Sequence, residues 1–585
     1  MRLKMRNVGL SGQGIWYDIL KSRGIEDPIA WKNVEFENEG LVDYSLLCPI
    51  EMSRAQDKLL SAVINNSKIA VVVDTDVDGY TSSAVLVNYL IEKFAFDNFQ
   101  ILFHRGKEHG LSDLMNCFDD DVRLVITPDA GSNDIECHKI LKHKNIDTIV
   151  LDHHIVEETS DYAIVINNQI SDHPSKAMTG VAVTWLFCKF IEETSFELPW
   201  VEDGYDVDVS KYLDLVALGC LSDMADYRDH FVRTVVDLGT WRIQNAFINA
   251  MCKKQEYSMN KMGGKTYMAF AFYVTPYMNA VCRTGTMEEK EMMFKALVSP
   301  WCYTSVPSTK RGSAGQMVPL YEQAVYAVGK AKERQTDIQN AGLDYIEGII
   351  EDKNLNKNAV LIACCDPDEI DPAVCGLIAN KLQSKYQKPA MVLRKIDGAY
   401  KGSARNYSMS EIEDLKGLCD ESGLFEYCAG HSGAFGLSLP EDKLSDFVSF
   451  ANSTYQNVST DPVYWIDYML TTREFRNHKA AVTIEAIAEM AKYWGQQVPE
   501  AKVGVRVPVK DVQLIGASKN TIKMNVNGVD IIKFKASPQE CVEWTENTDD
   551  KVVTIYGTCK LNEYNGTVTP QILIEDYFIE EELIF

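Results

Sequence analysis

The stretch VVVDTDVDGYTSS, residues 71–83, sets Asp74, Asp76 and Asp78 in alternation with other residues, just before a glycine. This spacing also begins the calcium loop of an EF-hand, which needs a bidentate glutamate at its twelfth position and a helix on each side. The twelfth position here is Val85, and an apolar, β-branched run precedes Asp74. These two features argue against a calcium loop.

The flanks of the acidic loop indicate its local fold. The run Ile69–Val73 is typical of a buried strand. Residues 81–94 follow a helical pattern, with Thr81 or Ser82 as the expected N-cap. In an open α/β sheet, ligands and metals bind beyond the carboxyl ends of the strands. An aspartate-rich turn without function is the alternative that this stretch alone leaves open, because aspartate favours turns.

Length and composition bound the class of protein. The chain has 585 residues, of which 46% are apolar and 24% charged. Because one hydrophobic core stops growing at roughly 250–300 residues, we expect three or more domains. The sequence contains no apolar run of about 18 residues and no convincing signal peptide, so we expect a cytoplasmic protein that does not enter membranes. Its 15 cysteines form no C-x-x-C pair and are expected to be reduced and buried.

The net charge of the chain is −26. This value argues against a passive nucleic-acid coat, which is normally basic. It is compatible with an enzyme that binds nucleic acid through a local basic groove. A cluster of carboxylates that holds metal ions also makes a chain more acidic.

The order of elements predicts an α/β fold with several domains. Apolar, β-rich runs occur at 68–74, 99–104, 123–129, 147–152 and 162–167. Helical patterns separate several of them, which indicates a largely parallel sheet. A helix over 318–353 leads to a second α/β unit, and short strands with Gly and Asn turns after 501 indicate an all-β barrel. The expected domains are a lead-in 1–50, an α/β catalytic domain 51–250, a helical connector 251–355, a second α/β domain 356–455, a linker 456–500 and a barrel 501–585.

Acidic and imidazole side chains gather where the strands of the first sheet end. One strand runs into Asp74, another ends in Asp129, and a third ends in Asp152-His153-His154, while Asp223 follows an apolar helix. Alone, an adjacent pair of histidines is usually polar surface. Together these groups are the ligands that Mg²⁺ and Mn²⁺ prefer, and their number suits two ions. Two ions ~3.5–4 Å apart clamp the attacking and leaving oxygens in phosphoryl transfer.

Nine motifs in order carry a resemblance to a known family. They are DTDVDGYTSS (74–83), HRGKEHGLS (104–112), ITPDAGSND (126–134), LDHHI (151–155), TGVAV (179–183), LDLVALGCLSDMADY (213–227), PYMNAVCRTG (276–285), GSAR (402–405) and AGHSGAFGLSL (429–439). This series resembles the DHH phosphoesterase superfamily, and most of all its RecJ-type single-strand exonucleases. The C-terminal barrel resembles the OB-fold that RecJ proteins append.

The resemblance implies a fold and an activity. The fold would be α/β, with two lobes of DHH and DHHA1 type joined by a long helix, plus an OB-like barrel. The activity would be a single-strand-specific DNA exonuclease, 5′ to 3′, that uses two Mn²⁺ or Mg²⁺ ions in DNA repair, recombination or replication. Single-stranded DNA would be its partner, with a helicase or single-strand-binding protein as a further one, and the protein would be a monomer. Two alternatives stay open, a phosphodiesterase for short oligonucleotides or cyclic dinucleotides and a non-catalytic replication scaffold.

The resemblance also implies roles for single residues. The metal ligands would be Asp74, Asp76, Asp78, Asp129, His153, His154 and Asp223, of which Asp76, Asp129, His153 and His154 would be catalytic. Asp152 would orient a histidine. The residues that bind nucleic acid or its terminal phosphate would be Arg105, Asn279, Arg283, Gly402, Ser403, Arg405 and His431.

Two departures from the family's pattern concern substrate contacts. The family often has Gly-Gly-His where this chain has Ala429-Gly430-His431, and a Trp-His pair where it has Ile370-Asp371. On the barrel, the expected stacking and backbone contacts are Trp544, Tyr556, Lys560 and Tyr564.

Overall fold

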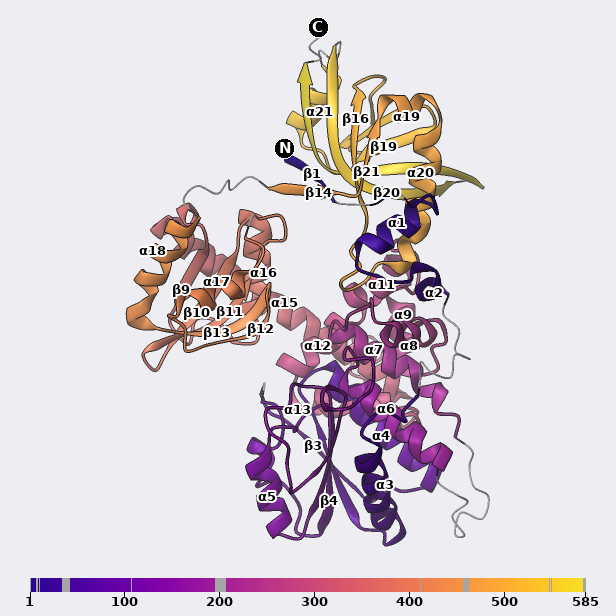
Figure 1. Cartoon of the computed structure of the whole chain (residues 1–585), viewed down its shortest axis with the longest axis vertical. Helices are drawn as coiled ribbons and strands as arrows, with labels where there is room; N and C mark the ends of the chain where they lie inside the picture. The colour runs from indigo at the N-terminus through magenta and orange to yellow at the C-terminus, as the bar shows by residue number, and fades with distance from the viewer. Residues whose placement is uncertain are drawn as a thin grey trace. The chain divides into compact units, whose positions relative to one another are not determined.

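The computed structural model describes residues 2–6, 9, 11–33, 43–106, 108–194, 207–410, 412–455, 462–546, 548, 550–564 and 566–581 (Figure 1). The chain forms two compact units. We call Arg23–Glu333 with Ala491–Pro499 the N-proximal unit, and Met1–Ser22 with Arg334–Met490 and Glu500–Phe585 the C-proximal unit. No helix among the described residues is long and apolar enough to cross a bilayer.

A parallel five-stranded sheet forms the centre of the N-proximal unit. Its order is β3 (Phe99–Phe103), β2 (Lys68–Val73), β4 (Val122–Pro128), β5 (Asp147–Asp152) and β6 (Ile164–Asn167). Every neighbouring pair is parallel. Strands covered on both faces read as continuous apolar runs, as in β2, whose last five residues are all buried. The five predicted strands and the parallel sheet are confirmed.

Helices cover this sheet and extend the unit. They are α2 (Pro28–Lys32), α3 (Pro49–Ile64), α4 (Val77–Phe94), α5 (Ile135–His143), α6 (Gly180–Thr194), α7 (Leu213–Ser222), α8 (His230–Trp241), α9 (Ala246–Lys254), α10 (Glu256–Asn260), α11 (Tyr267–Tyr273), α12 (Thr275–Thr284), α13 (Met287–Leu297) and α14 (Ser299–Cys302), with a hairpin of β7 (Ser305–Pro307) and β8 (Met317–Pro319). Helix α4 is buried from its first residue to Leu90 and packs against α6 and α7. These contacts fix the amino end of α4, and with it the acidic loop, at the carboxyl edge of the sheet.

The helix after the acidic loop begins earlier than expected. Its N-cap is Asp76, whose side chain accepts hydrogen bonds from the amides of Asp78 (2.9 Å) and Gly79 (3.1 Å). Thr81 lies inside the helix, where its hydroxyl donates to the carbonyl of Val77 at 2.9 Å. The predicted N-cap at Thr81 or Ser82 is therefore wrong. Aspartate caps a helix as well as serine does, so the acidic loop supplies the cap itself.

The long connecting helix is confirmed as α15 (Leu320–Lys353), which begins in the N-proximal unit and ends in the C-proximal one. It leads into the second α/β domain. There β9 (Leu361–Cys365) and β10 (Ala390–Ile396) are parallel, and β11 (Ala399–Arg405), β13 (Ala434–Pro440) and β12 (Tyr427–His431) continue the sheet antiparallel. Its helices are α16 (Cys375–Tyr386), α17 (Leu415–Ser422) and α18 (Leu444–Thr454).

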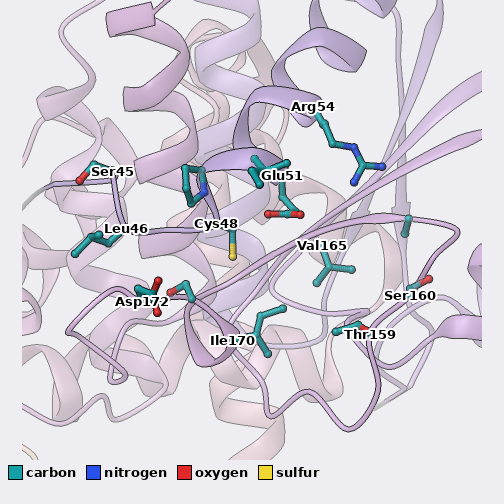
Figure 2. Close-up of a pocket in the computed structure, with 14 residues that line it drawn as sticks. Ser45, Leu46, Cys48, Glu51, Arg54, Thr159, Ser160, Val165, Ile170 and Asp172 are labelled. Atoms are coloured by element: carbon teal, nitrogen blue, oxygen red, sulfur yellow. The ribbon is translucent and has the colours of Figure 1, made fainter.

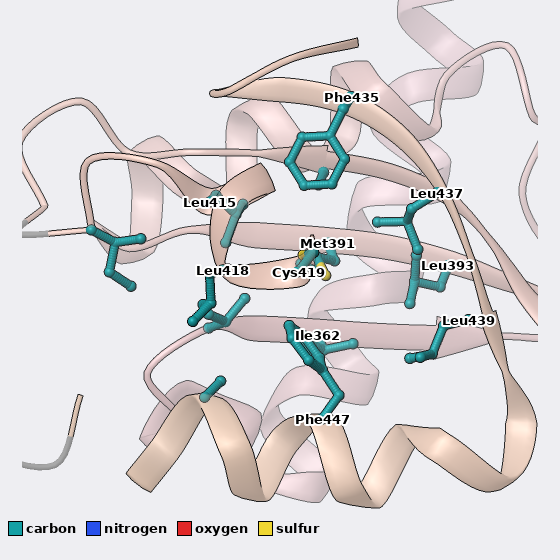
Figure 3. Packing of buried hydrophobic residues seen from close by; sticks show 14 residues of the cluster. Ile362, Met391, Leu393, Leu415, Leu418, Cys419, Phe435, Leu437, Leu439 and Phe447 are labelled. Carbon is teal, nitrogen blue, oxygen red and sulfur yellow. The ribbon is translucent and has the colours of Figure 1, made fainter. Parts of the chain in front are cut away.

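One face of this second sheet carries a compact apolar core (Figure 3). Leu393 and Leu437 come from neighbouring parts of the sheet, and Phe447 approaches them from α18. All three side chains are fully buried. The opposite face packs a second apolar cluster against α16, in which Ala363 of β9 and Val392 of β10 are buried.

The C-terminal domain is a seven-stranded sheet. Its order is β15 (Tyr468–Thr471), β16 (Lys502–Pro508), β20 (Lys551–Tyr564), β21 (Thr567–Glu581), β19 (Val529–Lys533), β18 (Thr521–Val526) and β17 (Gln513–Ile515), with helices α19 (Thr472–Arg476), α20 (Lys479–Ala488) and α21 (Pro538–Thr545). The stretch 456–500, expected to be a linker, thus contains several elements of this domain.

A short ribbon accompanies the barrel. In it, β1 (Arg2–Met5) pairs in parallel with β14 (Val463–Ile466), and α1 (Ile15–Ser22) follows β1 in the chain. The pattern of the lead-in indicates helix and loops, so strand β1 is an unpredicted element.

The expected nucleic-acid contacts on the barrel are partly wrong. Trp544 is fully buried, Tyr556 is 4% exposed, and Tyr564 is 72% exposed. Lys560 lies 2.6 Å from a carboxylate oxygen of Glu500. Trp544 and Tyr556 therefore belong to the core, and of the three aromatic residues only Tyr564 offers an open ring.

Candidate metal centre

Seven acidic or imidazole side chains converge at the carboxyl edge of the N-proximal sheet. Their ligand atoms form three groups within which all atoms lie within 4.8 Å of one another: Asp74, Asp76 and Asp129; Asp78, His153 and Asp223; Asp129, His153 and His154. Asp129 and His153 each belong to two groups. The structure thus brings together all seven residues expected as metal ligands, and the shared members are what two adjacent ions would use in common.

Buried polar atoms within this cluster lack partners. Among the described residues, Oδ1 of Asp74 and Oδ1 of Asp129 are buried and accept no hydrogen bond. The Nε2 atom of His153 lies 3.2 Å from Asp129 Oδ1 without hydrogen-bond geometry. An unpaired buried carboxylate is costly, and a divalent cation removes that cost. The oxygen and imidazole donors suit Mn²⁺ or Mg²⁺, so the residues present fit such ions.

The acids of the cluster also repel one another. Burial, followed by the charges of Asp74 and Asp78, raises the pKa of Asp76 to about 6. Burial and the same neighbouring acids raise the pKa of Asp129 well above its ordinary value, and burial with Asp78 does so for Asp223. Without a cation, ionising this cluster near neutral pH therefore opposes folding.

This repulsion predicts a pH-dependent stability of the metal-free protein. A carboxyl whose folded pKa exceeds its unfolded value favours the folded state at low pH, and that advantage is lost as pH rises from about 4 through the folded pKa, about 6 for Asp76. We expect the melting temperature in EDTA to fall between pH 5 and pH 8, and Mn²⁺ to restore it at pH 8. Asp129→Asn should flatten this pH dependence and weaken the response to Mn²⁺. Equal melting temperatures of the metal-free wild type at both pH values would contradict the prediction.

Asp152 holds the two histidines in place. Its Oδ1 accepts hydrogen bonds from the amide of His153 (2.7 Å) and from Nδ1 of His154 (2.8 Å), and its Oδ2 from the amide of Ser132 (3.1 Å). Burial alone would raise the pKa of Asp152, but the bonds and charges of the histidines hold it below its usual range. The bond to Asp152 raises the pKa of His154 to about 9. With Nδ1 engaged in this way, Nε2 of His154 is left as the ligand atom.

Asp78 joins two helices as well as facing the cluster. Its Oδ2 accepts from the amide of Gly180 at 2.8 Å, and its Oδ1 accepts from the amide of Val181 and the hydroxyl of Thr179, both at 3.2 Å. These donors form the amino end of α6, where a carboxylate is favourable. Asp78 therefore fastens α4 to α6 while its Oδ2 lies 4.0 Å from Nε2 of His153.

Two glycines let helices approach the acids closely. A Cβ atom on Gly180 of α6 would lie 2.3 Å from Asp129 Oδ1, and one on Gly219 of α7 would lie 2.3 Å from Asp78 Oδ1. Real Cβ atoms essentially never come this close to another atom. A methyl group on Gly180 would also lie 2.6 Å from the Cα atom of Asp129, so it must shift the whole residue with its carboxylate. Asp129 itself has a φ of 69°, a strained value for a non-glycine residue and one seen at functional sites.

Gly180→Ala should damage the metal centre without removing a ligand. Because the added methyl group displaces the Asp129 carboxylate, we expect Mn²⁺ affinity, measured by titration calorimetry, to fall at least about tenfold. Gly348→Ala in α15 is the matched control, because its added Cβ would meet nothing within 4 Å. Unchanged Mn²⁺ affinity in a folded Gly180→Ala variant would contradict the prediction and show that α6 can shift away from Asp129.

Two histidines of the site were missed by sequence reasoning. His104 directly follows β3, its Nδ1 is hydrogen-bonded to Asp113 at 2.9 Å, and its buried Nε2 lies 4.0 Å from Asp74 Oδ1. His109 Nδ1 lies 2.6 Å from Asp74 Oδ2. The position of His104 at a strand end was the same signal that identified Asp74 and Asp129. His109 lies in a loop, where no periodicity marks it.

Three residues expected to bind nucleic acid lie in the same unit as the acids. Arg105 is exposed on the loop after β3. The buried ammonium of Lys290 donates to the carbonyls of His104 (2.9 Å) and Arg105 (3.3 Å), and so fixes this loop. Asn279 and the exposed Arg283 belong to α12, which packs against α4 and α7. Asp78 belongs to α4, and Asp223 directly follows the last residue of α7.

A second polar group forms on the C-proximal sheet. In the register of the strands, Arg405 on β11 and His431 on β12 both lie opposite Ala434, so they share one face, and Ser403 lies two residues along it. A Cβ on Gly376, near the amino end of α16, would lie 2.7 Å from an Nη atom of Arg405 and 3.5 Å from the hydroxyl of Ser403. A helix amino end, a guanidinium and a hydroxyl are the donors that bind a phosphate group.

Gly402, expected beside this group, belongs to the other face of the sheet. Its register partners are the core residues Leu393 and Leu437, and a Cβ would lie 2.0 Å from the carbonyl oxygen of Val392. The glycine is needed for this close strand packing. Its side of the strand faces the apolar core and not Ser403 or Arg405.

A separate hollow of about 500 Å³ opens in the N-proximal unit (Figure 2). The start of α3 and the chain around β6 line it, with Cys48, Glu51 and Ser160 among its residues. None of its lining residues belongs to the acidic cluster. The hollow is therefore a surface feature distinct from the metal centre.

Three family models match separate parts of the chain. The DHH family, N-terminal domain, matches residues 68–220, the DHHA1 domain matches 357–457, and the RecJ OB domain matches 473–576. The first match contains six of the seven converging residues, and the second contains Ser403, Arg405 and His431.

Relatives extend over the whole chain. YorK, an SPbeta prophage-derived protein of Bacillus subtilis (strain 168) that is named as a single-strand DNA-specific exonuclease, is 32% identical over 97% of this chain and 97% of its own length. The single-stranded-DNA-specific exonuclease RecJ of the same organism is 26% identical over 91% of this chain, which spans 64% of that protein.

Solved structures show the same fold. Crystal structures of RecJ from Thermus thermophilus in complex with Mn²⁺ and with Mg²⁺ match with TM-scores of 0.69 and 0.62, each at 17% identity. They cover 99% and 98% of this chain, and 79% and 78% of the solved chains. The expected arrangement of two α/β lobes and a C-terminal barrel is confirmed.

Proposed function

Because this chain belongs to the RecJ family of single-strand-specific exonucleases, we propose that it is a metal-dependent enzyme that removes nucleotides from the end of single-stranded DNA. The observation that carries the proposal is the complete set of seven converging acids and imidazoles. A non-catalytic scaffold has no need to keep mutually repelling carboxylates around unpaired buried oxygens.

The side chains divide the catalytic work. Asp74, Asp76 and Asp129 would hold one Mn²⁺ or Mg²⁺ ion and Asp78, His153 and Asp223 a second, with Asp129 and His153 near both. Such a pair supplies an activated water at neutral pH and neutralises charge on the phosphoryl oxygens. Asp152, hydrogen-bonded to Nδ1 of His154, would leave Nε2 of that histidine as the atom that binds an ion. Arg105, on the loop that Lys290 fixes, would contact the strand's backbone.

The polarity we propose is 5′ to 3′. Its support is the group formed by Ser403, Arg405 and the amino end of α16, which is suited to a terminal phosphate. An enzyme that grips a terminal phosphate cleaves at a fixed distance from that end. His431, on the same face of the sheet, would contact the first nucleotide.

One assay separates the proposal from its alternatives. Labelled single strands of several lengths and cyclic dinucleotides are incubated with Mn²⁺ or with EDTA. We expect long single strands to be degraded in Mn²⁺ and to stay intact in EDTA. A labelled duplex, added as a further substrate, should resist degradation in Mn²⁺. Cleavage of only short or cyclic substrates would indicate a small-substrate phosphodiesterase, and no cleavage in any metal would indicate a scaffold.

The cellular setting follows from the substrate. Single strands arise in DNA repair, recombination and replication, so we propose a cytoplasmic enzyme that acts beside a helicase or a single-strand-binding protein. We propose that it works as a monomer, because one chain contains both the metal cluster and the phosphate group.

A further inference from the structure

The strand β1 is unusually basic for this chain. Residues 2–6 read RLKMR, three cations in five residues of a protein whose net charge is −26. Alternate residues of a strand face opposite sides. Leu3 packs toward Tyr464, Ile466 and Tyr556, so Arg2, Lys4 and Arg6 are directed to the other side.

These cations line a groove in the C-proximal unit. Its volume is about 680 Å³, and its lining includes Arg2, Lys4, Arg6, Asn406, Tyr407 and Trp465. The amide of Val463 donates to the carbonyl of Met409 at 2.9 Å, which ties β14 to the loop that forms the opposite wall. We call this cavity the basic groove. The acid among its lining residues is Glu413.

Trp465 gives the basic groove an aromatic surface. It lies opposite Lys4 in the register of the ribbon, and the Lys4 ammonium lies 5.3 Å from the centroid of its ring. The ring is half-buried, unlike Trp544 and Tyr556, which lie in the core. Arg6 also lies 3.9 Å from Asp467. The groove thus combines cations at every second position, ~6.8 Å apart along the strand, with a partly open ring.

We propose that the basic groove binds the backbone of single-stranded DNA, with Trp465 stacked on a base. A cationic track with an aromatic platform is how proteins bind single strands without reading sequence. The Tyr407 hydroxyl, which donates to the weak acceptor Met409 Sδ at 3.4 Å, adds a neutral donor for phosphate or sugar, while Asn406 shapes the wall by donating to the carbonyls of Ile412 and Glu413. The inference rests on the proposed function for the identity of the strand. It adds a contact made by the ribbon, outside the barrel aromatics expected from sequence.

The test is equilibrium binding of a fluorescent 20-nucleotide oligo-dT in EDTA, at several salt concentrations, without cleavage. The variant R2A/K4A/R6A is compared with K330A/K385A/K395A, which removes three lysines that already pair with Glu333, Glu347 and Glu441. Both variants change the net charge equally. We expect the first to weaken binding at least about tenfold and to reduce the slope of log K against log salt by about 2, because each single-strand phosphate contact contributes about 0.7. Binding by the second variant should stay near that of the wild type.

Trp465 tests the stacking contact separately. Trp465→Ala should weaken oligo-dT binding about fivefold or more, and Trp465→Phe should retain most of it, since base stacking is worth ~1–3 kcal/mol. Hydrolysis of a trinucleotide in Mn²⁺ should be unchanged in every groove variant. Equal affinity and slope in the two triple variants would overturn the proposal. The proposal would also fail if an oligoglutamate peptide competed for the groove as strongly as unlabelled oligo-dT and Trp465→Ala had no effect on binding. These two results together would assign the groove to an acidic polypeptide.

The binding assay also separates this inference from the proposed function. A wild type that binds oligo-dT through the groove but never cleaves it would refute the exonuclease and keep the groove. If the wild type and R2A/K4A/R6A degraded long strands equally well, the exonuclease would stand and the groove would be refuted.

Discussion

Asp129→Ala is expected to lower the rate of strand degradation at least about a hundredfold, ~2.7 kcal/mol of transition-state stabilisation, with the fold preserved. Asp129 belongs to two of the three ligand groups, and its Oδ1 is a buried atom without a hydrogen-bond partner among the described residues. Removing it takes a ligand from both proposed ions. Asp76→Ala should have an effect of the same order. The measurement is the initial rate on a 5′-labelled single strand in Mn²⁺.

The matched control for these variants is Asp120→Ala, an exposed acid in the loop before β4, at the opposite end of that strand from Asp129. It should keep the wild-type rate. Circular dichroism and a melting curve establish that each variant is folded, and calorimetry should show weaker Mn²⁺ binding in the two active-site variants only. Near wild-type rates in folded Asp76→Ala and Asp129→Ala would remove these residues from the reaction.

Arg405→Ala is expected to raise KM for 5′-phosphorylated strands about tenfold, ~1.4 kcal/mol. The guanidinium lies beside the Ser403 hydroxyl and the amino end of α16, so it is placed to form a charge-assisted hydrogen bond with a terminal phosphate. A strand with a 5′-hydroxyl has no such group to lose, and its KM should change much less. Side-by-side kinetics on the two substrates measure the difference.

Two further variants sharpen this experiment. Arg405→Lys keeps the charge but not the planar fork, so it should recover only part of the loss. Arg394→Ala removes an arginine from the neighbouring strand β10, whose guanidinium donates to the carbonyl of Pro367, and should leave KM unchanged. Equal losses on all substrates would exclude Arg405 from end recognition. Degradation that stops only at a 3′ block would reverse the proposed polarity.

The metal cluster could be foreseen because its signal is local and topological. Asp74, Asp129 and His153 each follow a short apolar run, and parallel strands bring their carboxyl ends to one edge. His104 satisfies the same rule and was overlooked because its strand ends in a single imidazole without an acid beside it. The N-cap was expected at Thr81 or Ser82 and lies at Asp76, because the Asp76 side chain caps the helix and also belongs to the cluster.

Features that depend on distant partners could not be foreseen. Trp544 follows an ordinary amphipathic pattern, and nothing local shows that its ring is fully buried. The face occupied by Gly402 depends on the register between β10, β11 and β13, which a one-residue shift would reverse. Strand β1 was missed because its partner β14 lies more than 400 residues later in the chain. The periodicity of a sequence indicates that a segment is a strand or a helix, but it does not show which distant segment pairs with it.

The pairing of Arg2 with Val463 has a consequence for how the protein is made. A ribosome adds ~5–20 residues per second, so strand β1 waits roughly 20 to 90 s after its own synthesis before β14 exists. During that interval its backbone edge and its cations are open to any polyanion or unpaired strand nearby. The ribbon closes only after both α/β domains have been translated, and its formation marks a late stage in the maturation of the nascent chain.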